Sequence, residues 1–259
     1  LPLTNTSTQV GLVWNSSNQL CECPRNTITN PLYQTNILWV SLAKYCECPS
    51  PALTDPTKQS ALIYDATAKF CKCSPGTITS STTQILIPYD SNKRFCECPR
   101  KSTFTDPPRQ TELIWNPSIN LCECPKLTTL GPQQVALKLS STNDFCQCPL
   151  NTSTLLTGQV KLVLNSGATA CECPQKGTAL TSVQTSLVLS NPATSCSCPT
   201  STITSPSIQT SSVLAGAGTY CECPNPSVSD STWQTNIVWK TNGAVCECPQ
   251  KSTAIDTTK

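Results

Sequence analysis

Residues 34–49, QTNILWVSLAKYCECP, decide the fold of this chain because the same arrangement recurs along its length. A glutamine stands twelve residues before a Cys-x-Cys pair, and this combination occurs ten times at intervals of about 25 residues. One spacing of 26 residues is followed at once by one of 24. A chain that restores its period in this way is a tandem array of one supersecondary unit. We therefore predict a single repeat array over residues 1–259, with no separate domains.

Each repeat has the composition of β-structure. Residues 34–39 contain β-branched and aromatic side chains and predict one strand, and residues 44–49 predict a second strand after a polar turn. Proline follows the second cysteine in nine repeats, where its missing N–H ends a strand ladder. The predicted fold class is all-β, as an elongated tandem-repeat array of ten units.

Two architectures fit this pattern: a β-solenoid, in which like residues stack, and a string of disulfide-linked β-hairpins. Stacking would bring like charges together, which destabilises adjacent strands. Glutamate lies between the two cysteines in seven repeats, at Glu22, Glu47, Glu97, Glu123, Glu172, Glu222 and Glu247. Only nine glycines are present to turn the corners of ten coils. Both architectures remain open at this stage.

The cysteines predict a disulfide framework. An even number at fixed spacing, without histidine, is typical of proteins from an oxidising compartment. A four-cysteine zinc site would require two neighbouring pairs to meet, and we expect no metal. The cysteines are Cys21, Cys23, Cys46, Cys48, Cys71, Cys73, Cys96, Cys98, Cys122, Cys124, Cys146, Cys148, Cys171, Cys173, Cys196, Cys198, Cys221, Cys223, Cys246 and Cys248.

Two pairing schemes are possible, because a bond within one Cys-x-Cys pair would close a strained ring. In the first, the second cysteine of each pair bonds the first of the next, as Cys23 with Cys46. Each such loop of about 24 residues contributes roughly 3 kcal/mol in the chain-entropy model. This scheme leaves Cys21 and Cys248 for a neighbouring subunit or a continuing chain. The second scheme joins repeats two by two and leaves none over.

The sequence also indicates attached sugar. Sequons of the Asn-x-Ser type make Asn5, Asn15 and Asn151 candidate N-glycosylation sites. Serine and threonine form about a quarter of the residues and gather near proline, a composition typical of O-glycosylated stalks. The candidate O-glycosylation sites are Thr27, Thr29, Thr77, Thr79, Thr152, Thr154, Thr202 and Thr204.

Two further positions recur in every repeat. Five residues after the glutamine stands an aromatic residue or leucine, such as Trp39 or Tyr64, which indicates a core position rather than a carbohydrate platform. The glutamates lack the neighbouring Asp and Asn ligands of a calcium loop, so we expect them to be exposed, solubilising charges.

Several function classes are disfavoured. Charged residues are 12% of the chain, the net charge is +2, and no basic block could follow a nucleic-acid backbone. No apolar run reaches the length of a membrane span. Without histidine or a non-repeating constellation of catalytic residues, we predict no enzymatic activity and no cofactor other than covalent glycans.

We therefore predict a structural subunit of a secreted extracellular or cell-surface filament, stalk or appendage that self-associates. Both ends of the chain lie within the linker between repeats, so we expect the array to continue along a longer chain or into a next subunit. The alternative is a ligand-binding β-repeat protein that recognises ice, through its Thr-x-Thr pairs, or carbohydrate as an adhesin.

Overall fold

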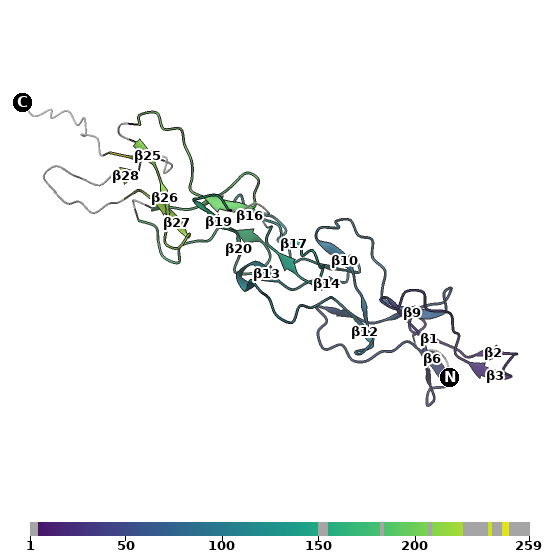
Figure 1. Ribbon diagram of the computed structural model, residues 1–259. Helices are drawn as coiled ribbons and strands as arrows, with labels where there is room; N and C mark the ends of the chain where they lie inside the picture. Colours follow the sequence, from purple (N-terminus) through teal and green to yellow (C-terminus); the bar gives the residue numbers. More distant parts are fainter. Residues whose placement is uncertain are drawn as a thin grey trace, which may run out of the picture. The chain divides into compact units, whose positions relative to one another are not determined.

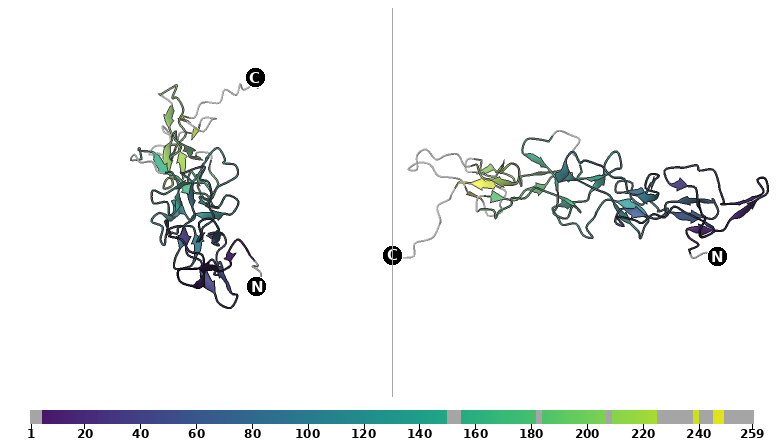
Figure 2. Two further views of the ribbon diagram at one scale, coloured as in Figure 1. Left: turned by 90° about the vertical axis from the view of Figure 1, so that its right-hand side faces the viewer. Right: turned by 90° about the horizontal axis from the view of Figure 1, so that it is seen from below.

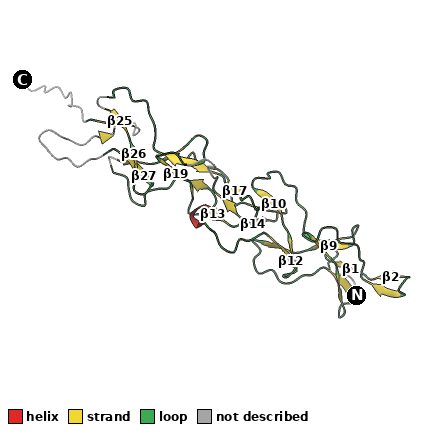
Figure 3. Cartoon of the chain, viewed as in Figure 1, coloured by secondary structure: helices red, strands yellow, loops and turns green. Residues whose placement is uncertain are grey.

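The structure, a computed structural model, describes residues 5–149, 155–181, 184–206, 209–224, 238–239 and 245–248. Short strands joined by long loops make up these residues, and their one helical element is a single 3-10 turn, η1 (Pro107–Arg109) (Figure 1, Figure 3). The prediction of an all-β tandem array is confirmed.

Three kinds of strand recur along the described residues, and we call them the glutamine, middle and cysteine strands. The glutamine strands are β1 (Gln9–Val10), β4 (Gln34–Thr35), β7 (Gln59–Ser60), β10 (Gln84–Leu86), β13 (Gln110–Thr111), β16 (Gln134–Val135), β19 (Gln159–Lys161), β22 (Gln184–Thr185) and β25 (Gln209–Ser211). The middle strands are β2 (Val13–Asn15), β5 (Leu38–Val40), β8 (Ile63–Asp65), β11 (Tyr89–Asp90), β14 (Ile114–Asn116), β17 (Lys138–Leu139), β20 (Val163–Leu164), β23 (Val188–Leu189), β26 (Val213–Ala215) and β28 (Val238–Trp239). The cysteine strands are β3 (Leu20–Glu22), β6 (Tyr45–Glu47), β9 (Phe70–Lys72), β12 (Phe95–Glu97), β15 (Leu121–Glu123), β18 (Cys146–Gln147), β21 (Cys171–Glu172), β24 (Ser195–Ser197), β27 (Tyr220–Glu222) and β29 (Val245–Glu247).

The segment predicted as one strand over residues 34–39 is in fact two strands in different sheets. β4 and β5 are separated by Asn36 and Ile37, and Ile37 is buried. The bend lets the glutamine strand pair with the next repeat while the middle strand pairs with its own cysteine strand. Because strands this short contain hardly one period of alternation, the sequence pattern did not reveal the break.

Each three-stranded sheet is assembled from two repeats. The cysteine strand lies at the centre, its own middle strand on one side and the glutamine strand of the preceding repeat on the other. The sheets are β1-β6-β5, β4-β9-β8, β7-β12-β11, β10-β15-β14, β13-β18-β17, β16-β21-β20, β19-β24-β23, β22-β27-β26 and β25-β29-β28. Strands pair antiparallel, as in β4 with β9 and β8 with β9. Of the two architectures left open, the structure therefore has the hairpin string, with a strand exchanged between neighbouring repeats.

The chain forms two compact units. The first contains residues 1–126 and 137–147, and the second contains residues 127–136 and 148–259. In the first unit, the hairpin of β2 and β3 is a two-stranded sheet that extends away from the sheet of β1, β6 and β5 (Figure 1, Figure 2). Five of the three-stranded sheets belong to the first unit and four to the second.

The core is a small apolar cluster repeated in each sheet. A buried aliphatic side chain lies three residues after the glutamine, at Ile37, Leu62, Ile87, Leu113, Leu137, Leu162 and Leu187. The residue before the first cysteine is buried too, at Phe70, Phe95, Leu121, Phe145, Ala170 and Val245. The expectation that the aromatic position is core was wrong: Trp14 and Trp39 are exposed, and Tyr64, Tyr89 and Trp115 are only half-buried. The buried side chain of each repeat instead lies two residues before the aromatic position, at the bend between the glutamine strand and the middle strand.

Linkers close the outer edges of the sheets. The amides of Tyr64 and Tyr89, in middle strands, donate hydrogen bonds to the carbonyls of Ser7 and Leu32, each two repeats earlier. Trp115 donates in the same way to Thr57. An exposed strand edge invites pairing with other chains. The third, fourth and fifth repeats therefore receive backbone hydrogen bonds from the repeat two places before them.

Candidate functional site at the junction between repeats

The junction between consecutive repeats is the recurring site of this chain, and a disulfide holds it. Within the described residues the bonds are Cys23–Cys46, Cys48–Cys71, Cys73–Cys96, Cys98–Cys122, Cys124–Cys146, Cys148–Cys171, Cys173–Cys196, Cys198–Cys221 and Cys223–Cys246. The paired Cα atoms are 5.5–5.8 Å apart. This is the first of the two pairing schemes, and it leaves Cys21 and Cys248 as exposed free thiols.

A glutamine side chain contacts both sides of the junction in five of the repeats. In the third repeat, Gln59 Oε1 accepts from the backbone amides of Thr54 at 2.8 Å and Asp55 at 2.9 Å, which fixes the linker. Gln59 Nε2 donates to Glu97 Oε1 at 3.1 Å, on the cysteine strand of the next repeat. Gln59 is 3% exposed, so these hydrogen bonds satisfy polar groups that water does not reach. One amide group therefore orders its own linker and binds its neighbour.

The hydrogen bond between glutamine and glutamate recurs in four other junctions. Hydrogen bonds join Gln9 to Glu47, Gln84 to Glu123, Gln134 to Glu172 and Gln209 to Glu247. The register explains the recurrence, because each glutamine lies opposite the residue between the two cysteines of the next repeat. The glutamates of successive repeats do not stack on one another, because each lies on the central strand of a separate sheet.

The expectation of exposed glutamates was therefore wrong. Glu97, Glu123 and Glu247 are buried. A buried carboxylate is tolerated when several donors reach it. The clue in the sequence was the glutamine, which never varies among the ten repeats although an exposed position would accept many polar residues. A polar residue that stays the same in every repeat indicates buried hydrogen bonds.

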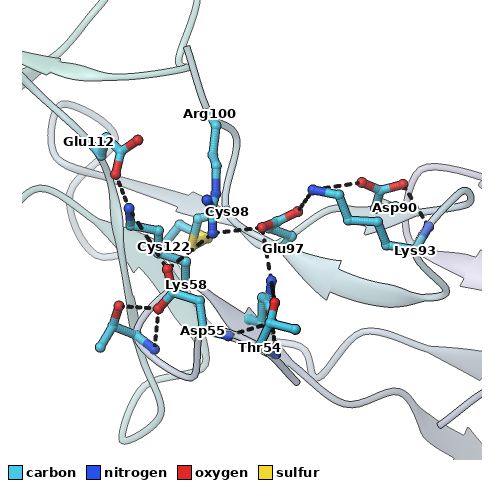
Figure 4. A network of polar contacts seen from close by, with 12 residues as sticks. Thr54, Asp55, Lys58, Asp90, Lys93, Glu97, Cys98, Arg100, Glu112 and Cys122 are labelled. Carbon is cyan, nitrogen blue, oxygen red and sulfur yellow. Dashed lines mark hydrogen bonds and ion pairs between the residues drawn. A yellow bond between two sulfur atoms is a disulfide. The ribbon is translucent and has the colours of Figure 1, made fainter. Parts of the chain in front are cut away.

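Around Glu97 the charges form a network (Figure 4). Lys93 Nζ lies 2.5 Å from one carboxylate oxygen and Arg100 2.9 Å from the other. Arg100 also reaches Asp55, at 3.1 Å, so that it links the linker of one repeat to the cysteine strand of the next. The bond to Glu97 raises the pKa of Lys93 above its ordinary value.

Glu123 has a similar environment in the fifth repeat. Burial raises the pKa of this carboxyl, but hydrogen bonds from Asn116, Lys126 and Gln84 together outweigh burial and hold the pKa below its ordinary value. Asn116 donates to Oε1 at 2.7 Å, and Lys126 donates to Oε2 at 3.0 Å. The junction is thus built to keep this carboxylate ionised.

The first junction is open. β2 and β3 form the only two-stranded sheet among the described residues, and no described residue pairs with the free edge of β3. Cys21 lies at this edge and is exposed. The hairpin that is incomplete as a sheet is therefore also the one whose first cysteine lacks a disulfide.

The candidate glycosylation sites differ in accessibility. Asn5 is exposed, whereas Asn15 is half-buried and its Nδ2 donates to Glu22. Thr27, Thr29, Thr77, Thr79, Thr202 and Thr204 are exposed. The hydroxyls of Thr29, Thr79 and Thr204 donate to the glutamine of their own repeat, which leaves the first threonine of each pair as the better acceptor. Asn151, Thr152 and Thr154 lie outside the described residues.

The described residues contain no cluster of three potential metal ligands and no helix able to cross a membrane. Comparison with protein-family models, curated proteins and solved structures found no match.

Proposed function

We propose that this protein is a structural subunit of a secreted extracellular filament or surface appendage. The observation that carries this proposal is the repetition of the junctions: strand exchange and a disulfide recur from repeat to repeat, and a glutamine–glutamate hydrogen bond recurs in five of the junctions. An active site is normally built once and interrupts the local pattern. Here the chemically distinctive residues are the most regular ones, and they join repeats.

Disulfides support the extracellular setting. Nine are formed among the described residues, and such density is typical of oxidising compartments. Each repeat has too small an apolar cluster to be stable alone, so cross-links and neighbours supply its stability. Glycans on the exposed first threonines would add solubility to a chain with 12% charged residues.

The ligand-binding alternative receives no support from the threonine pairs. Their second hydroxyl turns to the glutamine at Thr29 and Thr79 rather than contributing to a uniform outer face.

The test is assembly of the chain secreted from eukaryotic cells. The oxidised protein is expected to form filaments in negative-stain electron micrographs, to sediment as a polymer, and to carry excess mass in sugar-sized steps. Reduction should dissolve the filaments. A chain that stays monomeric at every concentration, with all its thiols reduced on secretion, would refute the proposal.

A further inference from the structure

One junction carries a cation where the others carry glutamate. Gln34 lies opposite Lys72 across the sheet of β4, β9 and β8. Glutamate lies opposite the glutamine at six of the described junctions. Two other junctions have the neutral residues Gln147 and Ser197 at this place. Among the described junctions, Lys72 alone places a positive charge there.

The side chain of Gln34 has an unused donor. Its Oε1 accepts from the amides of Thr29 at 3.2 Å and Asn30 at 3.0 Å, as in the other linkers. Its Nε2 has no acceptor among the described residues. Lys72 Nζ donates to Asp65 at 2.5 Å, and an ammonium group has three donors. The junction therefore has two facing donor groups and lacks the carboxylate that lies between donors elsewhere.

An apolar cavity of about 180 Å³ adjoins these donors. Its walls come from the second, third and fourth repeats, and they are held in place by the backbone. The amide of Cys73 donates to the carbonyl of Tyr33 at 3.0 Å, and the amide of Tyr89 donates to that of Leu32 at 2.6 Å. The side chains that the cavity contacts include those of Tyr33, Gln34, Lys72, Pro75, Leu86 and Ile87.

The next junction bridges the corresponding positions with charge. Lys58 precedes Gln59 as Tyr33 precedes Gln34, and Glu112 follows its glutamine by two residues as Leu86 does. Lys58 and Glu112 form an ion pair (Figure 4). Tyrosine and leucine at these positions cannot pair, and they are instead walls of the cavity.

We propose that this cavity binds a small organic acid that has one apolar ring. The ring lies among Tyr33, Leu86 and Ile87, and the carboxylate accepts from Gln34 Nε2 and Lys72 Nζ. An apolar cavity of about 150 Å³ is large enough for benzene, so one ring fits. The carboxylate of the ligand takes the place that glutamate has in other junctions, with charge-assisted hydrogen bonds. This site goes beyond the structural role and does not depend on assembly, because one chain supplies all of it.

A sugar acid suits the cavity less well. Its ring hydroxyls would lie against apolar walls, and a polar group buried without a hydrogen-bond partner is costly. An aromatic or alicyclic monocarboxylic acid has no such groups. The expected class of ligand is therefore an apolar acid, and a sugar acid is a suitable negative probe.

The test measures binding of benzoate to the full-length oxidised chain, with para-fluorobenzoate observed by fluorine NMR. We expect saturable binding with a Kd of about 1 mM, which is typical of so small a ligand. Benzyl alcohol, acetate and glucuronate lack the charge, the ring or the apolar surface, and each should bind at least about tenfold more weakly. Benzoate should also shift the NMR signal of the Gln34 side-chain amide.

Two double variants close the site by copying other junctions. Tyr33→Lys with Leu86→Glu installs the pair of Lys58 and Glu112, which should fill the cavity and abolish binding. Asp65→Asn with Lys72→Glu copies Asn116 and Glu123, which bond each other, and supplies an acceptor for Gln34. Binding should then fall by about tenfold or more. Hydrogen exchange at the amide of Cys73 checks that each variant is folded.

Two single variants complete the set. Asp65→Asn keeps the cavity and removes the carboxylate that competes for Lys72, so benzoate should bind about two- to fivefold more tightly. The Asp65 Oδ1 contacts to the amides of Thr67 and Ala68 can be kept by asparagine, so the turn is retained. Lys69→Glu is the control for charge: Lys69 is exposed on the same hairpin and does not line the cavity, and affinity should change less than twofold.

Four results would overturn the proposal. They are no saturable binding at benzoate concentrations up to about 20 mM, acetate or glucuronate binding as well as benzoate, unchanged affinity in a folded double variant, and unchanged or weaker binding by Asp65→Asn. The last result needs no double variant, so the proposal stays open to refutation if those variants fail to fold. Filament formation by the wild-type chain is scored separately and has no bearing on this outcome.

Discussion

Replacing Gln59 with leucine measures how much the glutamine contact contributes to one junction. The substitution keeps an apolar stem but removes the acceptor for the amides of Thr54 and Asp55 and the donor to Glu97. A neutral hydrogen bond contributes about 1 kcal/mol net, and one to a charged group about 1.5–3 kcal/mol. Local stability should therefore fall by about 4 kcal/mol, because Gln59 is buried and water does not replace its contacts.

The matched control is Gln34→Leu. Gln34 accepts from the amides of Thr29 and Asn30 in the same way, but its partner across the sheet is Lys72 instead of glutamate. The bonds from the two amides and from the Thr29 hydroxyl are lost, but no bond to a carboxylate, so the expected cost is smaller, about 2 kcal/mol. The difference between the variants isolates the bond to the buried carboxylate.

Native-state hydrogen exchange is the suitable assay, because an array of disulfide-bonded repeats does not unfold as a two-state system. The reporting amides are Cys98, which donates to the carbonyl of Lys58 at 2.8 Å, and Cys73, which donates to that of Tyr33 at 3.0 Å. Equal losses of protection at the two amides would show that the glutamine–glutamate bond contributes nothing and would refute the reasoning.

Three further perturbations have defined outcomes. Ser212 occupies the position that is leucine or isoleucine in the buried cores, and its hydroxyl is buried without a partner. Ser212→Leu should therefore raise the local free energy of opening by about 1–2 kcal/mol and slow hydrogen exchange there. Faster exchange would contradict the assignment of this position to the core. Lys69 has a φ of 56°, which suits glycine, and Lys69→Gly should leave stability unchanged or raise it by up to about 1 kcal/mol in thermal unfolding, whereas a clear loss would show that the turn does not require this conformation. The folded-state pKa of Glu123 is lowered, so its ionised carboxylate contributes stability above its ordinary pKa of 4.5, and this contribution is lost as the pH falls through the lower folded value. Glu123→Gln should therefore reduce the loss of local stability at acid pH, measured by hydrogen exchange over a pH series. An unchanged loss would exclude Glu123 as its source.

The repeat and its β-character could be foreseen from spacing and composition. The sequence left two disulfide schemes open, and the structure has the one that joins consecutive repeats. It did not reveal that the glutamine strand leaves its own repeat. That outcome depends on the bend at Asn36 and Ile37, where one buried side chain directs two short strands into different sheets. Propensity is the same on either side of the bend, so only packing decides it.

The burial of the glutamates was hidden for a related reason. Glu97 is buried only because Gln59 reaches it from 38 residues away, together with Lys93 and Arg100. A carboxylate without these donors would remain in water. Hydrogen-bond partners so distant in sequence cannot be assigned from one repeat. The presence of glutamine in all ten repeats nevertheless indicated that its side-chain amide makes a recurring hydrogen bond.

Disulfide mapping of the secreted chain tests the central claim, that each repeat is completed by its neighbour, most directly. Proteolysis after the glutamate between the two cysteines of seven repeats, and after Lys72, separates the members of these pairs, so their bonds can be assigned to single cysteines. The account predicts linked peptides that join Cys23 to Cys46, Cys48 to Cys71 and so on through Cys223 to Cys246. Bonds that join repeats two by two, or thiols that remain free between residues 23 and 246, would contradict it.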